Sequence, residues 1–418
     1  MRYFYTLLLY LSLPLVLGRL LWRSLRAPAY RQRWRERLGY LQDTVQPGGI
    51  WIHAVSVGEV QAIAPLVHLL QRQHPDRSLW ITTTTPTGSA TVRRLLGEQV
   101  GHSYMPYDLP GCLNRFLQHV RPAVFLMVET EIWPNLLYAC RRQGIRTLLA
   151  NGRLSERSLQ RYQRVAGFAH KVFGQVDRVA AQTEADAQRF AALGVTRDAI
   201  EVTGSIKFDM QIPASVEEHV EVMRRGWGGR PVWVAASTHE GEDEIMLAAH
   251  AALLRDIPDA LLVLVPRHPE RFDRVTAQII KSGLNLARRS MGQQPGTEVQ
   301  VYLGDTMGEL PVMLGAVDAA FIGGSLAKVG GHNMLEAAAQ GVPVCFGPHT
   351  FNFALISHML LECGAARCVD DAISLEQVLL GWLSDASERS AAGEAGRQMV
   401  ERNRGALQKL YRILEELL

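Results

Sequence analysis

Short apolar runs alternate with longer stretches of helical periodicity along most of the 418 residues. Apolar runs of five or six residues that end in polar turns are typical of parallel strands buried on both faces. The pattern forms two series, separated by a polar stretch from Gly204 to about Gly229. It therefore predicts an α/β protein with two doubly wound parallel sheets. The predicted strands are Ile50–Val55, Leu79–Thr83, Ala123–Val128, Arg146–Ala150, Arg178–Gln182 and Ala199–Thr203, then Val232–Ala236, Ala260–Val265, Val299–Leu303, Ala319–Ile322 and Val342–Phe346.

The composition suits such a protein. It is 47% hydrophobic and 20% charged, close to soluble globular averages, which argues against disordered and polytopic membrane classes. The five cysteines form no C-x-x-C pair, so a zinc ribbon and a thioredoxin-like motif are excluded. We expect reduced thiols that mostly fill the core.

The N-terminus carries a membrane signal. Tyr3–Leu17 has no charged residue, and as a helix it would span ~23 Å of the ~30 Å hydrocarbon core. Extension to Trp22 reaches the full span if Arg19 extends to the interface. Positive charge follows the apolar run, the reverse of a cleaved signal peptide, and predicts a cytoplasmic location for the rest of the chain. Residues 1–22 are therefore interpreted as an anchor, spanning or interfacial; the alternative is an amphipathic helix packed inside the fold.

Positive charge is confined to this region. Residues 1–37 contain eight Arg and one Glu, whereas the whole chain has a net charge of +3. A mixture of Arg with Trp22 and Trp34 suits anionic inner-membrane lipids. The remainder of the chain is net acidic, so the sequence predicts no nucleic-acid partner.

Several familiar motifs are missing. There is no G-x-G-x-x-G after a strand, no G-x-x-x-x-G-K-[ST], and no G-x-S-x-G. A dinucleotide-binding dehydrogenase, a P-loop ATPase and an α/β-hydrolase lose support. No H-E-x-x-H and no D-x-D occurs, so the sequence shows no metal-ligand set and predicts neither a metal nor a cofactor.

In the second series, three predicted strands end in loops suited to a nucleotide. The block Gly323–Glu336 is glycine-rich and leads into a predicted helix, whose first N–H groups suit a phosphate; alternatively, the glycines only permit a tight turn. Arg267 and His268 follow a second strand, and Gly308, Glu309 and Leu310 follow a third. Ligands of doubly wound folds bind beyond the carboxyl ends of the strands, so this half is predicted to bind an activated donor.

In the first series, carboxylates occupy the equivalent places. Glu59 follows the first strand and can act as a general base on an alcohol; equally, it can complement the dipole of the helix that begins there. Glu129 and Glu131 directly follow an apolar strand, where carboxylates are costly unless solvated or functional. Lys207 can neutralise an anionic donor or be an ordinary surface lysine.

The chain resembles the bacterial 3-deoxy-D-manno-octulosonic acid (Kdo) transferases of lipopolysaccharide core synthesis. The resemblance spans nearly the full length and lies in motifs that are specific to the family. These are Ala27–Arg31 with Arg33 and Trp34, His53–Glu59, Pro106–Pro110, Glu129–Asn135, Gly204–Asp209, Ser237–Glu242, the Arg267 and Glu309 loops, Gly323–Glu336 and Gly347–Phe353.

The resemblance implies a GT-B glycosyltransferase, with two Rossmann-like domains facing a cleft and a membrane-anchor helix. It implies CMP-Kdo as donor, the tetraacylated lipid A precursor (lipid IVA) as acceptor, and inversion without a metal, at the cytoplasmic side of the inner membrane. By motif match, Glu59 is the base, and Glu129 and Lys207 stabilise the transition state. The predicted CMP-binding residues are Arg267, His268, Gly308, Glu309, Leu310, Asn333, Met334, Leu335 and Glu336.

The expected domains are an anchor (1–22), an acceptor domain (23–210), a linker (211–229) and a CMP-Kdo-binding domain (230–418). Two other functions stay open at this point. One is a GT-B-like transferase or epimerase acting on another nucleotide sugar, and the other is a membrane-bound binding protein whose site has decayed. Protection against heat by CMP rather than UDP would favour the Kdo transferase.

Overall fold

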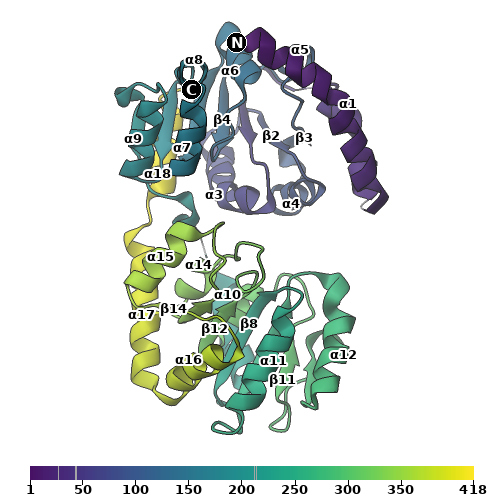
Figure 1. Ribbon diagram of the computed structural model, residues 1–418, viewed down its shortest axis with the longest axis vertical. Coiled ribbons are helices and arrows are strands. Elements are labelled where there is room, and N and C mark those ends of the chain that lie inside the picture. Colours follow the sequence, from purple (N-terminus) through teal and green to yellow (C-terminus); the bar gives the residue numbers. More distant parts are fainter. Residues whose placement is uncertain (27, 43–44, 211, 213) are drawn as a thin grey trace. The chain divides into compact units, whose positions relative to one another are not determined.

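The computed structural model describes residues 1–418 except 27, 43–44, 211 and 213. Two compact units divide the chain: unit 1 is Met1–Met210 with Arg404–Leu418, and unit 2 is Gln211–Asn403. Each contains one seven-stranded sheet in which every neighbouring pair of strands is parallel (Figure 1). The prediction of two doubly wound sheets is confirmed.

In unit 1 the strand order is β3-β2-β1-β4-β5-β6-β7. The order reverses between β1 and β4, which makes that point the topological switch point of the sheet. The strands are β1 (Ile50–His53), β2 (Leu79–Thr83), β3 (Gly101–Tyr104), β4 (Val124–Val128), β5 (Arg146–Gly152), β6 (Arg178–Ala181) and β7 (Ile200–Val202). The helices are α1 (Arg2–Arg26), α2 (Trp34–Arg37), α3 (Val57–Gln73), α4 (Pro86–Leu96), α5 (Pro110–Val120), α6 (Pro134–Arg142), α7 (Glu156–Gln163), α8 (Ala166–Phe173), α9 (Glu184–Ala192) and α18 (Ala406–Glu415).

Both faces of this sheet are buried. Ile50 and Ile52 belong to a core with α3, α4 and α18, whereas Trp51 belongs to a core with α5, α6, α8 and α9. Alternate residues of one strand thus enter opposite cores, which explains why the strands read as unbroken apolar runs. The predicted start of α4 is confirmed: Thr85 caps the helix and Pro86 is its first residue.

In unit 2 the strand order is β10-β11-β9-β8-β12-β13-β14, and its switch point lies between β8 and β12. The strands are β8 (Val232–Thr238), β9 (Leu261–Pro266), β10 (Leu286–Arg288), β11 (Val301–Leu303), β12 (Ala319–Ile322), β13 (Val344–Phe346) and β14 (Ala366–Cys368). The helices are α10 (Ala214–Gly226), α11 (Glu242–Leu253), α12 (Phe272–Ser282), α13 (Leu310–Gly315), α14 (Leu335–Ala338), α15 (Ala354–Glu362), α16 (Ala372–Ser384) and α17 (Ala386–Arg402). Six short 3₁₀ turns, η1 (Pro28–Arg31), η2 (Gly97–Gln99), η3 (Arg197–Ala199), η4 (Ile206–Asp209), η5 (Pro269–Arg271) and η6 (Arg289–Met291), complete the described elements.

Two expectations about the chain's organisation need correction. The segment after Gly204 is not irregular, since it forms η4 and then α10. Residues 404–418 do not belong to the second unit, because α18 buries Leu410 and Ile413 in the α3 core of unit 1. Of the cysteines, Cys112, Cys140 and Cys345 are buried, whereas Cys363 and Cys368 are exposed, and all five are free.

The N-terminal helix α1 extends to Arg26, beyond the predicted limit at residue 22. It is long and apolar enough to cross a membrane, and none of its most hydrophobic window is buried. The alternative of a helix packed inside the fold is therefore wrong.

Candidate functional site

The switch point of unit 1 carries the acids singled out in the sequence. Glu59 lies in the first turn of α3, just after β1, and Glu129 directly follows β4. Lys207 lies on η4, beyond β7, and its Nζ is 3.0 Å from Glu129 Oε1. The structure therefore brings together the three predicted catalytic residues from three distant parts of unit 1.

Glu59 takes part in the cap of α3. Its Oε2 accepts a hydrogen bond of 2.8 Å from the Val55 N–H, and its Oε1 accepts one of 2.8 Å from the Ser56 hydroxyl. The Ser56 side chain in turn accepts from the Glu59 N–H, so Ser56 is the N-cap of α3. The helix-terminal role considered for this residue is thus present in the structure.

The charge state of Glu59 is nevertheless unusual for a capping residue. Burial raises its pKa to about 7, against the opposing bond from Val55, and the neighbouring carboxylates Glu129 and Glu131 raise it further. A carboxyl group that titrates near neutrality is suited to take up a proton. Helix capping and general-base chemistry are therefore compatible in this side chain.

The loop after β4 is held in an uncommon backbone conformation. Glu129 has φ 59°, in the left-handed region that costs non-glycine residues about 1 kcal/mol or more. Its N–H donates to Ala150 O at 2.9 Å, and the Thr130 hydroxyl donates to Arg153 O. Such strain tends to collect at functional sites, and here it aims the Glu129 carboxylate at Lys207.

Glu131, noted in the sequence without an assigned role, lies beside this pair. Its Oε2 accepts a hydrogen bond of 3.0 Å from the Trp133 indole, and burial raises the pKa of its carboxyl group. Lys207 is positioned by its own turn: the Asn151 side chain accepts from the Ile206 N–H at 3.2 Å, and Ile206 is buried in the α3 core. Neither contact is evident from sequence spacing.

The switch point of unit 2 is built around a buried carboxylate, that of Glu242. The motif Ser237–Glu242 includes this residue, but the sequence did not predict its structural role. Glu242, 1% exposed at the start of α11, accepts hydrogen bonds from the N–H groups of His239, Gly324, Ser325, Leu326 and Ala327. The glycine-rich loop after β12 is thus held by the protein's own anion. These amides, at least, are not free for a phosphate, which revises the expectation for that loop.

The helix expected after the glycine-rich loop is also short. α14 has only four residues, and the Leu335 N–H donates to the Asn333 side chain at 3.1 Å. Asn333 donates in turn to Glu336 Oε1 at 3.0 Å. Met334 and Leu335 are fully buried, so their side chains pack in the fold and only their backbone remains for a ligand.

Arg267 and His268 follow β9, next to β8 in the sheet, and the Arg267 N–H donates to Thr238 O at 3.0 Å. Arg267 is electrostatically linked to the α14 segment, because it opposes the rise in the pKa of Glu336 that burial causes. Three imidazoles gather here: His239 and His332 stack with Nε2 atoms 2.8 Å apart, and His268 meets His239 edge-on. The His pair was not foreseen.

The loop after β11 carries the remaining predicted donor residues. Gly308 has φ 89°, Glu309 occupies the N-cap position of α13 without a capping bond from its side chain, and Leu310 is the first residue of the helix. Glu309 forms a two-pronged ion pair with Arg289, with contacts of 2.6–3.2 Å, which lowers the pKa of its carboxyl group. The sequence did not predict Arg289 as its partner.

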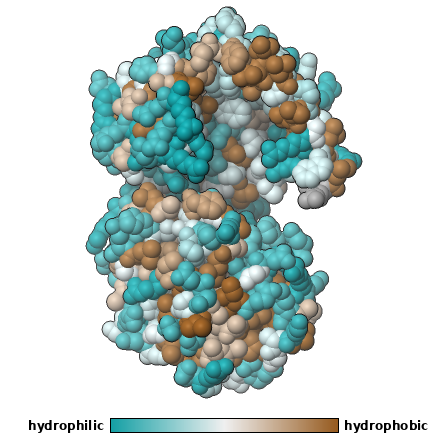
Figure 2. All heavy atoms as spheres, in the orientation of Figure 1, coloured by the Kyte–Doolittle hydropathy of each residue, from teal (hydrophilic) through white to brown (hydrophobic). Residues whose placement is uncertain are grey.

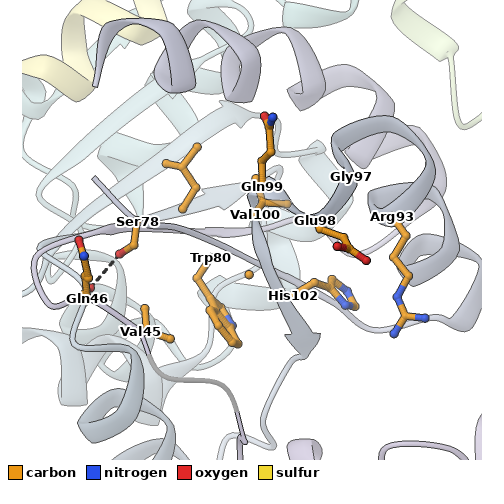
Figure 3. A pocket seen from close by; sticks show the side chains of 12 residues that line it. Val45, Gln46, Ser78, Trp80, Arg93, Gly97, Glu98, Gln99, Val100 and His102 are labelled. Atoms are coloured by element: carbon orange, nitrogen blue, oxygen red, sulfur yellow. Dashed lines mark hydrogen bonds between the residues drawn. The ribbon is translucent and has the colours of Figure 1, made fainter. Parts of the chain in front are cut away.

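A large hollow lies elsewhere. A cavity of about 780 Å³ lies at the amino ends of β2 and β3. Figure 3 shows the side chains that line it, among them Trp80, Arg93, Glu98 and His102. None of the predicted site residues is among those that line it. Chemistry in open α/β sheets occurs at the opposite, carboxyl ends of the strands, so we place the candidate site at the switch points.

Comparison with known proteins identifies the family of the chain. Residues 32–210 match the family model described as 3-deoxy-D-manno-octulosonic-acid transferase (kdotransferase). A 3-deoxy-D-manno-octulosonic acid transferase of Haemophilus influenzae is 43% identical over 100% of this chain and 99% of its own. One from Bordetella pertussis is 41% identical over 88% of this chain and 87% of its own.

Solved structures share the fold. A UDP-GlcNAc 2-epimerase from Neisseria meningitidis has a TM-score of 0.60 at 13% identity, covering 88% of this chain and 100% of its own. A glycosyltransferase from Rickettsia africae has a TM-score of 0.54 at 15% identity, covering 89% of this chain and 99% of its own. At identities this low, the similarity establishes a GT-B-like architecture only. The activity has to be argued from the residues of the site.

Proposed function

Because the chain belongs to the family of 3-deoxy-D-manno-octulosonic acid (Kdo) transferases, we propose that it transfers Kdo from CMP-Kdo to lipid IVA, the tetraacylated lipid A precursor, in lipopolysaccharide synthesis. The proposed reaction inverts the anomeric centre without a metal. The proposal rests on one observation at the switch point of unit 1. Lys207 forms an ion pair with Glu129, and Glu129 is close enough to Glu59 to raise the pKa of its carboxyl group.

In this mechanism Glu59 removes the proton of the acceptor hydroxyl as that oxygen attacks the anomeric carbon of Kdo. The bond from this carbon to the CMP phosphate breaks, and its electron pair leaves on the phosphate oxygen. The pKa of about 7 matches the task, since a base near neutrality is both deprotonated and able to bind a proton. The capping bonds from Val55 and Ser56 fix the carboxylate in place.

Glu129 and Lys207 stabilise the charges that develop during transfer. The sugar becomes oxocarbenium-like and is stabilised by a carboxylate, while its own carboxylate and the departing phosphate are stabilised by a cation. The 3.0 Å pairing keeps both groups oriented before substrate arrives. Preorganised charges cost no reorganisation at the moment of reaction.

CMP is assigned to unit 2, on Arg267, His268, Gly308, Glu309, Leu310 and the segment Asn333–Glu336. The Arg267 guanidinium is suited to pair with the phosphate. Glu309, held by Arg289, and Glu336, held by Asn333, are acceptors suited to sugar or base hydroxyl and amino groups.

We assign the protein to the cytoplasmic side of the inner membrane. The helix α1 supplies exposed apolar surface, and exposed arginines such as Arg19, Arg23 and Arg35 can each contribute about 1 kcal/mol near anionic headgroups. Arg37 is buried in unit 1 and donates to Thr84 O, so it is not available to a membrane. An acylated acceptor resides in the membrane, so such a location raises the effective concentration of enzyme at its substrate.

The test combines purified protein, CMP-Kdo and lipid IVA, with products weighed by mass spectrometry. A mass increase of one or more Kdo units is expected. CMP should raise the melting temperature, whereas UDP should not. Protection by UDP alone, with no Kdo product, would instead favour the alternative of a transferase or epimerase acting on another nucleotide sugar.

A further inference from the structure

The helix α1 is fastened to unit 1 by polar contacts at its beginning. The Tyr5 hydroxyl donates to Asp108 Oδ2 at 2.9 Å, and the Thr6 hydroxyl donates to Asn135 Oδ1 at 3.1 Å. The Arg2 guanidinium lies 3.3 Å from the centre of the Tyr138 ring. The first turns of α1 are therefore bound to the folded unit near the start of α6.

The other end of α1 is fastened to the same unit. Ser24, 1% exposed, accepts a hydrogen bond of 3.0 Å from Arg31, and the Arg23 guanidinium lies over the Tyr30 ring. The segment that follows is in turn bound to the sheet, because Arg33 donates to His102 O at 2.8 Å and Glu36 accepts from the Tyr104 N–H at 2.9 Å.

A spanning helix cannot keep both sets of contacts. Its two ends would lie on opposite sides of a hydrocarbon core of ~30 Å, whereas Tyr5 and Ser24 both bind parts of unit 1. Drawing the first turns through the bilayer would break the Asp108 and Asn135 bonds. It would also leave the Asp108 carboxylate, which is 3% exposed, without one of its donors.

The outward face of α1 has the composition of a membrane-interface helix. Figure 2 shows hydrophobic residues gathered along α1, and those that are 48–80% exposed are Tyr3, Phe4, Leu7, Leu8, Tyr10, Leu11, Leu15, Leu21, Trp22 and Leu25. Arg19 and Arg23 are exposed at the C-terminal half of the helix, where they can reach anionic headgroups. The contacts to unit 1 leave this apolar face uncovered along most of its length.

We propose that α1 lies along the headgroup–acyl boundary of an anionic leaflet, with both ends on the cytoplasmic side, and that Tyr5 and Asp108 latch it to unit 1. Asp108 also accepts the N–H groups of Asn135 and Leu136 at the start of α6, the helix that directly follows the loop of Glu129 and Glu131. The latch thus ties the membrane helix to the loop that carries the acids. The idea rests on the proposed function, which gives the protein a membrane-bound acceptor.

Topology is tested with the full chain carrying one epitope tag before Met1 and another after Leu418. Protease should remove both tags from inside-out inner-membrane vesicles and neither tag from intact spheroplasts. Removal of the N-terminal tag in spheroplasts would show a spanning helix and overturn the proposal, as would a full-length protein that never sediments with membranes. The assay does not measure transfer, so a failed Kdo reaction would count against the proposed function alone.

The latch is tested by a matched pair, Tyr5→Phe and Tyr10→Phe. Each loses one hydroxyl from α1, but only Tyr5 is bonded to Asp108, and Tyr10 is half exposed. Hydrogen exchange of the first turns of α1 should become about tenfold faster in Tyr5→Phe and stay unchanged in Tyr10→Phe. Binding of both variants to phosphatidylglycerol-containing vesicles should be retained. Equal exchange in the two variants would overturn the latch.

Discussion

The two switch points treat their carboxylates in opposite ways. In unit 2, Glu242 accepts five backbone N–H groups, so its negative charge is compensated within the fold, although burial raises the pKa of Glu336 in the same unit. In unit 1, Glu59 and Glu131 are buried with less compensation, and burial raises the pKa of each. The same architecture therefore holds a hydrogen-bonded carboxylate under a loop in one unit and carboxyl groups with raised pKa values in the other.

The largest effect is expected from Glu59→Gln. The amide keeps an oxygen for the Val55 N–H but cannot act as a base, so turnover should fall by roughly 10²–10⁴-fold. The product assay measures it, with CMP affinity and melting temperature checked for an intact fold. Glu98→Gln, in the hollow at the opposite end of the sheet, is the control and should stay near wild type. If only the Glu98 variant lost turnover, the active site would lie in that hollow and not at the switch point.

Glu242→Gln tests the compensated carboxylate of unit 2 and should destabilise the loop that it holds. Its new NH₂ group would face at least two N–H donors that now share one carboxylate oxygen, and each buried donor left unpaired costs about 1–3 kcal/mol. Urea denaturation should show a corresponding loss of unfolding free energy, with weaker CMP binding. The exposed neighbour Glu240, paired with Arg274 at the surface, provides the control Glu240→Gln. Unchanged stability of the Glu242 variant would mean that the loop does not depend on this carboxylate.

A smaller effect is expected from Arg267→Ala, which should weaken CMP by about 10–100-fold. The estimate corresponds to a charge-assisted hydrogen bond of about 1.5–3 kcal/mol. Calorimetry of CMP binding measures it, and Arg274→Ala, exposed in the same unit, should bind like wild type. Equal CMP affinity in the Arg267 variant would show that its guanidinium does not contact the nucleotide.

The pH profile should give the smallest effect and the finest test. If Glu59 is the base, kcat/KM should rise about tenfold per pH unit up to about 7 and level off above it, because only the deprotonated carboxylate accepts a proton. Glu131→Gln removes a negative charge that raises the pKa of Glu59. The inflection should then move to lower pH by less than one unit. An unchanged inflection would show that the charge of Glu131 does not affect the pKa of the catalytic base.

The central strands were predictable because their apolar runs report burial on both faces, as in β4 and β9. Of the four edge strands, β7 was predicted, whereas β3, β10 and β14 were missed, since Gly101–Tyr104, Leu286–Arg288 and Ala366–Cys368 offer no apolar run. The helix α10 was missed because its many charged residues were interpreted as a linker.

For the site, individual acids and loops could be selected from their places after strands, but their partners could not. The ion pair of Glu129 with Lys207 and that of Arg289 with Glu309 join residues far apart or in different elements. The amides around Glu242 depend on the backbone path of a loop that is contributed by another strand. Such contacts are set by tertiary structure, which sequence periodicity does not encode.

The return of α18 to unit 1 has a consequence for synthesis on the ribosome. Unit 2 lies wholly between the two segments of unit 1, and at about 5–20 residues per second its translation occupies roughly 10 to 40 s. Until the last residues emerge, the α3 face that packs against Leu410, Ile413 and Leu414 has no cover. The unit that starts first is therefore the last to be finished, and a chain that terminates before α18 would contain all of unit 2 but only part of unit 1.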